Sequence, residues 1–220
     1  MLCLFSIATA FAHEPVNYYD RIHLMADASA KIENDTMIAT VYTVEEGSDA
    51  SSLSKIVNQR IRKGIDLVEK YPGIKFQTNN YTSNPVYSNN KIKGWRVSQS
   101  LRLESKDMTL MSDVIGRLQE TLALKNMSFT VSNESKNSQD EILINKALES
   151  FEKRAQQVAK KLNRNGYKIV NINISTSGVP VIRPQFEMRA MSVSSMDSSP
   201  AISAGEQTLK VTVNGSIELE

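Results

Sequence analysis

One stretch decides the fold of this chain, residues 73–105, which read GIKFQTNNYTSNPVYSNNKIKGWRVSQSLRLES. Two segments of alternating character lie on either side of a polar turn at residues 88–90. Successive side chains of a strand point to opposite sides of the sheet, so the second segment has one mainly apolar face. That face consists of Trp95, Val97, Gln99, Leu101 and Leu103. The sequence therefore predicts a long β-hairpin whose second strand buries one side.

Three amphipathic helices are predicted around this hairpin, at residues 50–71, 107–124 and 139–165. In each of them apolar residues recur every three or four positions, which gives the helix one stripe that faces the core. Pro72 ends the first helix because proline cannot continue the helical hydrogen bonds. Gly166 follows the third helix, at a position where glycine commonly ends helices.

Further strands are predicted from alternating or β-branched segments. They lie at residues 22–31, 37–44, 127–131, 167–175 and 206–219. The first two are separated by the turn signal Glu33-Asn34-Asp35, so we expect them to pair as an antiparallel hairpin. A hairpin followed by a helix then occurs twice along the chain. We predict an α+β fold with antiparallel or mixed sheets, three amphipathic helices and two related β-hairpin-plus-helix layers.

Two segments follow neither pattern. Residues 178–205 are rich in Ser, Pro, Ala and Met, have no period and are predicted to form a long irregular loop. Residues 1–12 read MLCLFSIATAFA, an apolar run that ends in small residues suited to signal-peptidase cleavage after Ala12. We interpret them as a signal-peptide remnant, the alternative being a buried N-terminal strand. Residues 20–220 are then expected to form a single domain.

The composition excludes several classes of partner. The 220 residues include 26 Lys and Arg and 24 Asp and Glu, and the net charge of +2 is too small to indicate a nucleic acid partner. No segment approaches the roughly 18 consecutive apolar residues of a transmembrane helix. Cleavage after Ala12 would also remove Cys3, the single cysteine, and with it disulfides and cysteine-based metal sites. We predict a soluble periplasmic or secreted protein.

The candidate metal ligands are few. After cleavage His13 would be the first residue, where its amine and ring could chelate copper, the alternative being a solvated terminal side chain. His23 is expected to be exposed on a strand, and with no third His or Cys a zinc site is not predicted. Met188, Met191 and Met196 in the irregular loop are the candidate ligands of a Cu(I) site. Alternatively, these methionines contact a neighbouring subunit.

No catalytic centre is predicted. Asp49 and Asp107 are interpreted as residues that start helices, and Asp35 as a turn residue. The chain has no Gly-x-Ser-x-Gly nucleophile motif and no glycine-rich phosphate loop. Trp95 is expected in the core, with the alternative that it lines a ligand groove. We therefore expect a protein that is not an enzyme and has no cofactor.

Three groups of residues form a pattern that extends over about residues 22–219. In the hairpin, the pattern consists of Gly73, Ile74, Thr78, Tyr81, Pro85, Tyr87, Ile92, Gly94 and Trp95. In the last helix and strand, it consists of Ala147, Arg154, Ala155, Ala159, Leu162, Gly166, Ile169 and Val170. A Met/Pro/Ser-rich segment at residues 180–199 before Gly205 and Glu206 completes it. The pattern resembles the SIMPL-domain family of bacterial periplasmic or outer-membrane-associated proteins.

The resemblance implies an α+β fold, export and symmetric oligomers, and no catalytic residues can be carried over because the family has none established. The family includes an oxidative-stress-defence protein and a periplasmic immunogenic antigen. We therefore expect an exported, non-enzymatic homo-oligomer of the bacterial envelope, periplasmic or associated with the outer membrane, with a role in envelope or oxidative-stress defence. The alternative is a periplasmic protein that binds a metal ion or small ligand through its Met-rich loop or a groove beside Trp95.

Overall fold

The computed structural model describes residues 19–176 and 204–220 of the chain. The elements are β1 (Arg21–Glu33), β2 (Thr36–Gly47), α1 (Ala50–Val68), β3 (Lys75–Ser88), β4 (Lys91–Ser105), α2 (Met108–Leu118), β5 (Ala123–Thr130), α3 (Asn133–Lys161), β6 (Tyr167–Thr176) and β7 (Glu206–Leu219). The predicted α+β class with three helices and antiparallel sheets is confirmed. Several predictions fall on residues outside the described ranges: the signal-peptide remnant at 1–12, nearly all of the loop at 178–205, His13, Met188, Met191 and Met196.

The strands form two sheets, with the order β1–β7–β6 in one and β3–β4–β2–β5 in the other. β1 and β2 therefore belong to different sheets, and the predicted hairpin of the first two strands is wrong. At their junction the amide of Asn34 donates to the carbonyl of Gly205, and the amide of Asp35 donates to the carbonyl of Thr130. These bonds lead the chain from one sheet into the other instead of closing a turn. Of the two predicted units of hairpin and helix, the described residues form one, β3–β4–α2.

The hairpin predicted around residues 88–90 is confirmed as β3 and β4, an antiparallel pair in which Pro85 lies opposite Trp95. β4 also pairs with β2 and is therefore an inner strand of its sheet. Its predicted core residues Val97, Leu101 and Leu103 are fully buried. Trp95 is partly exposed and packs beside Val97 at the end of the core next to α1.

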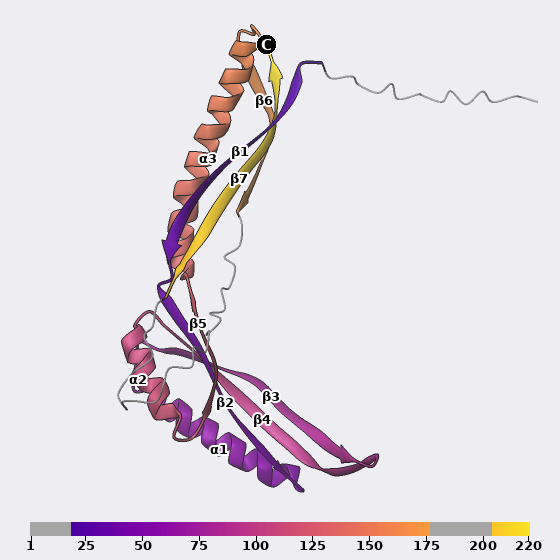
Figure 1. Cartoon of the computed structure of the whole chain (residues 1–220), viewed down its shortest axis with the longest axis vertical. Coiled ribbons are helices and arrows are strands. Elements are labelled where there is room, and N and C mark those ends of the chain that lie inside the picture. The colour runs from indigo at the N-terminus through magenta and orange to yellow at the C-terminus, as the bar shows by residue number, and fades with distance from the viewer. Residues whose placement is uncertain (1–18, 177–203) are drawn as a thin grey trace, which may run out of the picture. The chain divides into compact units, whose positions relative to one another are not determined.

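Helices α1 and α2 cover the same face of the four-stranded sheet (Figure 1). The helices and the strands bury one common cluster of apolar side chains. The cluster includes Met37, Ala39, Val41, Ile61, Val68, Leu101, Leu103, Met111, Val114, Ile115 and Leu118. Those from β2 occupy every second position of the strand, as expected for a sheet with one covered face.

The two helix boundaries that differ most from the prediction are the end of α2 and the start of α3. α2 ends at Leu118 instead of residue 124, and the amide of Leu122 donates back to the Leu118 carbonyl at 2.8 Å before β5 begins. Leu122 is buried in the same core as the apolar residues of α2. Its position matches the apolar periodicity of the helix, and the predicted helix therefore extends past Leu118. α3 begins at Asn133 instead of residue 139. The first turns of α3 are polar, so the sequence shows no apolar periodicity there that would predict a helix.

The described residues divide into two compact units. One comprises residues 29–143, 176 and 204–211, and it contains the α1 and α2 core. The other comprises residues 19–28, 144–175 and 212–220. In this second unit Phe151 of α3 packs against Gly215 of β7, where an added Cβ would lie only 2.8 Å from the ring. The close contact requires glycine and places α3 on one face of the three-stranded sheet.

Candidate functional site

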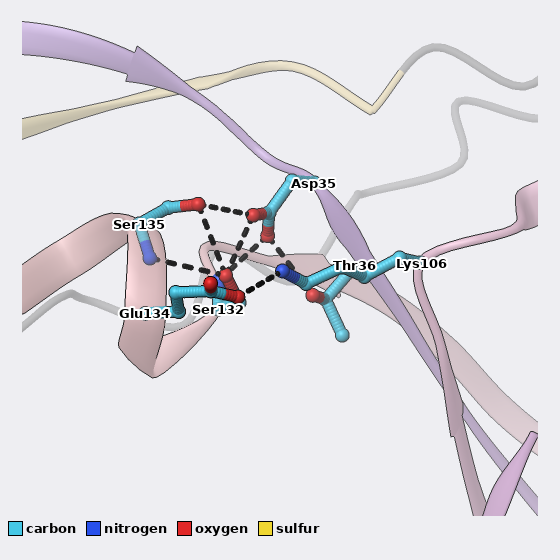
Figure 2. Close-up of polar contacts among 6 residues, drawn as sticks. All are labelled: Asp35, Thr36, Lys106, Ser132, Glu134 and Ser135. Atoms are coloured by element: carbon cyan, nitrogen blue, oxygen red, sulfur yellow. Dashed lines mark hydrogen bonds and ion pairs between the residues drawn. The ribbon is translucent and has the colours of Figure 1, made fainter. Parts of the chain in front are cut away.

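A dense polar cluster surrounds Asp35, in the junction between β1 and β2 (Figure 2). Its carboxylate accepts hydrogen bonds from the amide and the hydroxyl of Ser132 and from the hydroxyl of Ser135, each at 2.6 Å. Thr36 adds a fourth hydrogen bond at 2.9 Å. The Oγ of Ser132 also accepts from the amide of Ser135 at 3.3 Å, as expected of a helix N-cap. The cluster therefore attaches the first turn of α3 to the junction.

The electrostatics of this cluster indicate a structural role. Burial raises the pKa of the Asp35 carboxyl, but the hydrogen bonds from Ser132 and the neighbouring hydroxyls outweigh it and lower the pKa from 3.8 to about 2. Beside it the Nζ of Lys106 donates to Glu134 at 2.8 Å, which raises the pKa of Lys106 and lowers that of Glu134. A carboxylate with so low a pKa is a poor general base and does not activate a serine hydroxyl.

Asp35 lies between β1 and β2, as its prediction requires, but this junction is not the predicted turn. The sequence also did not indicate the partners of Asp35. Ser132 could have been found as an N-cap, because serine is among the residues preferred at that position. Its contact with Asp35 joins residues 97 positions apart, and no local pattern predicts that distance. The longest-range polar contacts of the cluster therefore became visible only in the folded chain.

A hollow of about 580 Å³ lies beside His23 on the three-stranded sheet. The Nδ1 of His23 is 2.8 Å from the Oγ of Ser216, and the amide of Ser216 donates to the Oδ1 of Asn171 at 2.8 Å. His23 is exposed, as predicted. Ser216 is only 3% exposed, so this pair does not offer a nucleophile to a substrate and instead fixes the orientation of the histidine ring.

The predicted helix-start residues are confirmed. Asp49 is the N-cap of α1 and accepts from the amide of Ser52 at 3.0 Å. Hydrogen bonding from the side chain and then the amide of Ser52 lowers the pKa of Asp49. Asp107 is the N-cap of α2 and accepts from the amide of Leu110 at 2.9 Å. Within the described ranges, no three His, Cys, Asp or Glu side chains come together as a metal site. The copper roles of His13 and of the loop methionines stay predictions.

The edge strand β6 exposes an apolar surface. It is an outer strand of its sheet, and every residue of the strand after Tyr167 is exposed. Four aliphatic side chains are between 37% and 46% exposed: Ile169, Val170, Ile172 and Ile174. The sole charged residue of the strand is Lys168, which forms an ion pair with Glu220 at 2.7 Å. We call this strand and its aliphatic side chains the β6 edge.

The other edge strands carry features that discourage pairing with further strands. Natural proteins protect sheet edges with charges, prolines and bulges. β1 carries four charged residues, Arg21, Asp27, Lys31 and Glu33. β3 contains Pro85 and two register shifts, and β5 contains Lys125 and a register shift against β2. β6 has no proline and one charge, so its sequence makes it the least protected edge.

The comparisons with known proteins identify a family. In the described part of the chain, no helix combines the length and the apolar character that crossing a membrane requires. None of the curated proteins compared with the chain matches it. Residues 22–217 match the family SIMPL, described as a protein of unknown function (DUF541), which confirms the resemblance in the sequence. The chain therefore belongs to the SIMPL family.

Proposed function

We propose that this protein is a non-enzymatic, exported member of its family that assembles into a homo-oligomer and contributes to envelope or oxidative-stress defence. The β6 edge is the observation that carries the proposal. An outer strand leaves a row of backbone N–H and C=O groups without strand partners, and these groups can pair with another chain. Here the row is combined with four exposed aliphatic side chains and a single, internally paired charge.

A second copy of this chain is the partner that fits the β6 edge best. Two β6 strands that run antiparallel around Ile172 would place Val170 of each copy opposite Ile174 of the other. Such cross-strand aliphatic pairs stabilise a sheet by roughly 0.2–1 kcal/mol each. No like charges would meet along the central residues, because Lys168 lies at one end and pairs with Glu220 of its own chain. Strand addition would add main-chain hydrogen bonds and join the two three-stranded sheets.

The oligomer is tested by measuring the mass of the full chain in solution. Light scattering coupled to size exclusion is expected to give a multiple of 24.5 kDa for the unmodified chain. Val170→Lys together with Ile174→Lys should give the monomer mass, because facing lysines repel each other across the paired edge. Ile56→Lys and Ile142→Lys are matched controls, since these helix residues are 40% and 45% exposed. The proposal would be contradicted if these control variants dissociated the oligomer as much as the β6 lysine variant does.

A rival interface lies on the β3–β4 hairpin. Tyr87 and Ile92 near its turn are 62% and 54% exposed. The double variant Tyr87→Ser and Ile92→Ser is expected to leave the oligomer intact. Dissociation by this variant, with no effect of the β6 lysines, would place the interface on the hairpin and remove the β6 edge from the proposal. A monomer mass for the unmodified chain at all concentrations would remove self-association altogether.

The proposal that the protein is not an enzyme rests on the hydrogen bonds that its polar side chains form. The carboxylate of Asp35 accepts four hydrogen bonds, and the hydroxyl of Ser216 is buried against His23. We expect purified protein to hydrolyse generic ester, peptide and phosphate substrates no faster than buffer. A rate above buffer that is lost in Ser216→Ala, with the fold preserved by circular dichroism, would contradict a non-enzymatic role.

Export and stress defence rest on the apolar residues 1–12 and on the SIMPL resemblance. Fractionation of bacteria that express the chain should recover it in the periplasm or with the outer membrane. Deletion of residues 1–12 should retain it in the cytoplasm. In a strain that lacks the protein, survival after peroxide is expected to fall and to be restored by the unmodified chain but not by the β6 lysine variant. Unchanged survival would remove the stress role.

A further inference from the structure

We propose that His23 and Met25 form a binding site for a soft monovalent cation, Cu(I) or Ag(I). The proposal goes beyond self-association and does not depend on it. The two residues are separated by one position on β1, so both side chains project from the same side of the strand. Their Cα atoms lie about 6.6 Å apart in an extended strand, a distance that an imidazole and a thioether can bridge through one ion. Both side chains line the hollow of about 580 Å³.

The site lies on the face of the three-stranded sheet that α3 does not cover. Gly215 faces α3, because an added Cβ would touch Phe151. Its neighbour Ser216 projects to the other face, since successive residues of a strand alternate. Ser216 is hydrogen-bonded to His23, so His23 and Met25 share that uncovered face. The thioether of Met25 is therefore accessible, and the residue is 55% exposed.

The ring of His23 is already oriented for a ligand. Its Nδ1 is engaged by the Oγ of Ser216 at 2.8 Å, and Ser216 is held through its amide by the side chain of Asn171. In the described part of the chain, none of the hydrogen bonds found involves Nε2. Histidines that bind metals usually have their second nitrogen hydrogen-bonded in this way, which fixes the tautomer and the ring. Arg154 also donates to the carbonyl of Met25 and so holds the strand at the second ligand.

The donor set determines the class of ion. A thioether sulfur is a soft ligand that selects Cu(I), whereas hard cations such as Mg²⁺ and Ca²⁺ take oxygen ligands. Structural zinc sites use four ligands from Cys, His or carboxylates. The described residues contain no cluster of three such side chains, so zinc is a poor match for the hollow. Ag(I) has the same ligand preference as Cu(I) and does not change its oxidation state during a titration.

Silver nitrate is the first probe, titrated into the full chain by calorimetry in a chloride-free buffer. The same samples give NMR spectra of the histidine ring and the methionine methyl groups. We expect the His23 ring and the Met25 methyl signals to shift together at the same silver concentration. Met25→Leu and His23→Asn should each weaken binding at least tenfold. Ser216→Ala, which retains both ligands, should weaken it about tenfold and broaden or shift the His23 signals.

Two controls separate this site from other sources of silver binding. Met188→Leu, Met191→Leu and Met196→Leu together remove the predicted loop site, and His13→Ala combined with Cys3→Ser removes the soft-metal donors of the N-terminal segment. Binding should persist in both if His23 and Met25 hold the ion. The proposal would be overturned if the triple methionine variant lost silver binding while Met25→Leu bound silver as tightly as the unmodified chain. Absence of silver binding to the unmodified chain would overturn it as well, and so would shifts confined to one of the two residues.

Discussion

Replacing Asp35 by asparagine tests whether its charge stabilises the unit that contains α1 and α2. The lowering of its pKa from 3.8 to about 2 means that the folded chain favours the ionised form. Each pKa unit is worth about 1.4 kcal/mol, which gives about 2.5 kcal/mol above pH 5. Because the Asp35 carboxyl is only partly buried, solvent screening lowers the expected loss in Asp35→Asn to about 1–2 kcal/mol.

The sign of the pH dependence follows from the direction of the shift. A carboxyl whose pKa is lower in the folded state stabilises the protein above its unfolded pKa, and this stability is lost as the pH falls toward the folded value. For Asp35 the window runs from about pH 4 down to about pH 2, and about half of the contribution is lost at pH 3. The difference in unfolding free energy between the unmodified chain and Asp35→Asn should therefore narrow across this window.

Urea unfolding followed by the fluorescence of Trp95 is a suitable assay. Trp95 is the single tryptophan and lies in the same compact unit as Asp35. Asp49→Asn is the matched control, because Asp49 is an exposed N-cap and asparagine caps helices about as well as aspartate. We expect it to change stability by less than about 0.5 kcal/mol. An Asp35→Asn difference that is equal at pH 7 and pH 3 would refute the charge argument.

Four further predictions concern the same unit and use the same unfolding assay. Gly116→Ala should stabilise it by about 0.5–1 kcal/mol, because alanine favours helices and the added Cβ would meet no atom within 4 Å beyond its chain neighbours and the backbone of its own helix. Gly94→Ala should destabilise it by more than about 1 kcal/mol, because the Cβ would lie 2.7 Å from the carbonyl oxygen of Gly47. Leu101→Ala should cost about 2–5 kcal/mol, since Leu101 is fully buried. Asp107→Ala should cost about 1 kcal/mol through loss of the α2 cap.

Local patterns in the sequence predicted local structure well. The alternation of residues 91–103 identified β4 and its buried face, because that pattern depends only on the geometry of a strand. Asp49 and Asp107 were recognisable as caps, because the hydrogen bonds of a cap lie within three residues. The apolar period identified α1, α2 and α3 but not every boundary. It extended α2 too far, since Leu122 is buried for a reason unrelated to helix formation.

Features that depend on strand order could not be predicted in the same way. Alternation identified β1 and β2 as strands, yet it does not say which strand is the neighbour, and the two belong to different sheets. The exposure of Ile172 likewise follows from the edge position of β6 and not from its sequence, which would suit a buried strand equally well. The partners of Asp35 were hidden for the same reason, because they meet only after β1, β2 and α3 are placed.

The proposed oligomer interface and the proposed ion site both involve β6, so a coupling between assembly and ion binding can be tested. Asn171, Ile172 and Asn173 of β6 line the hollow beside His23, and Val170 and its neighbours form the β6 edge. If a second copy pairs along β6, it restricts the movement of the residues that line the hollow. This changes the affinity of the His23 and Met25 site for the ion. Thermodynamic reciprocity then requires the ion to change the strength of assembly by the same factor. Equal silver affinity in the oligomer and in the β6 lysine variant would mean that the two sites act independently.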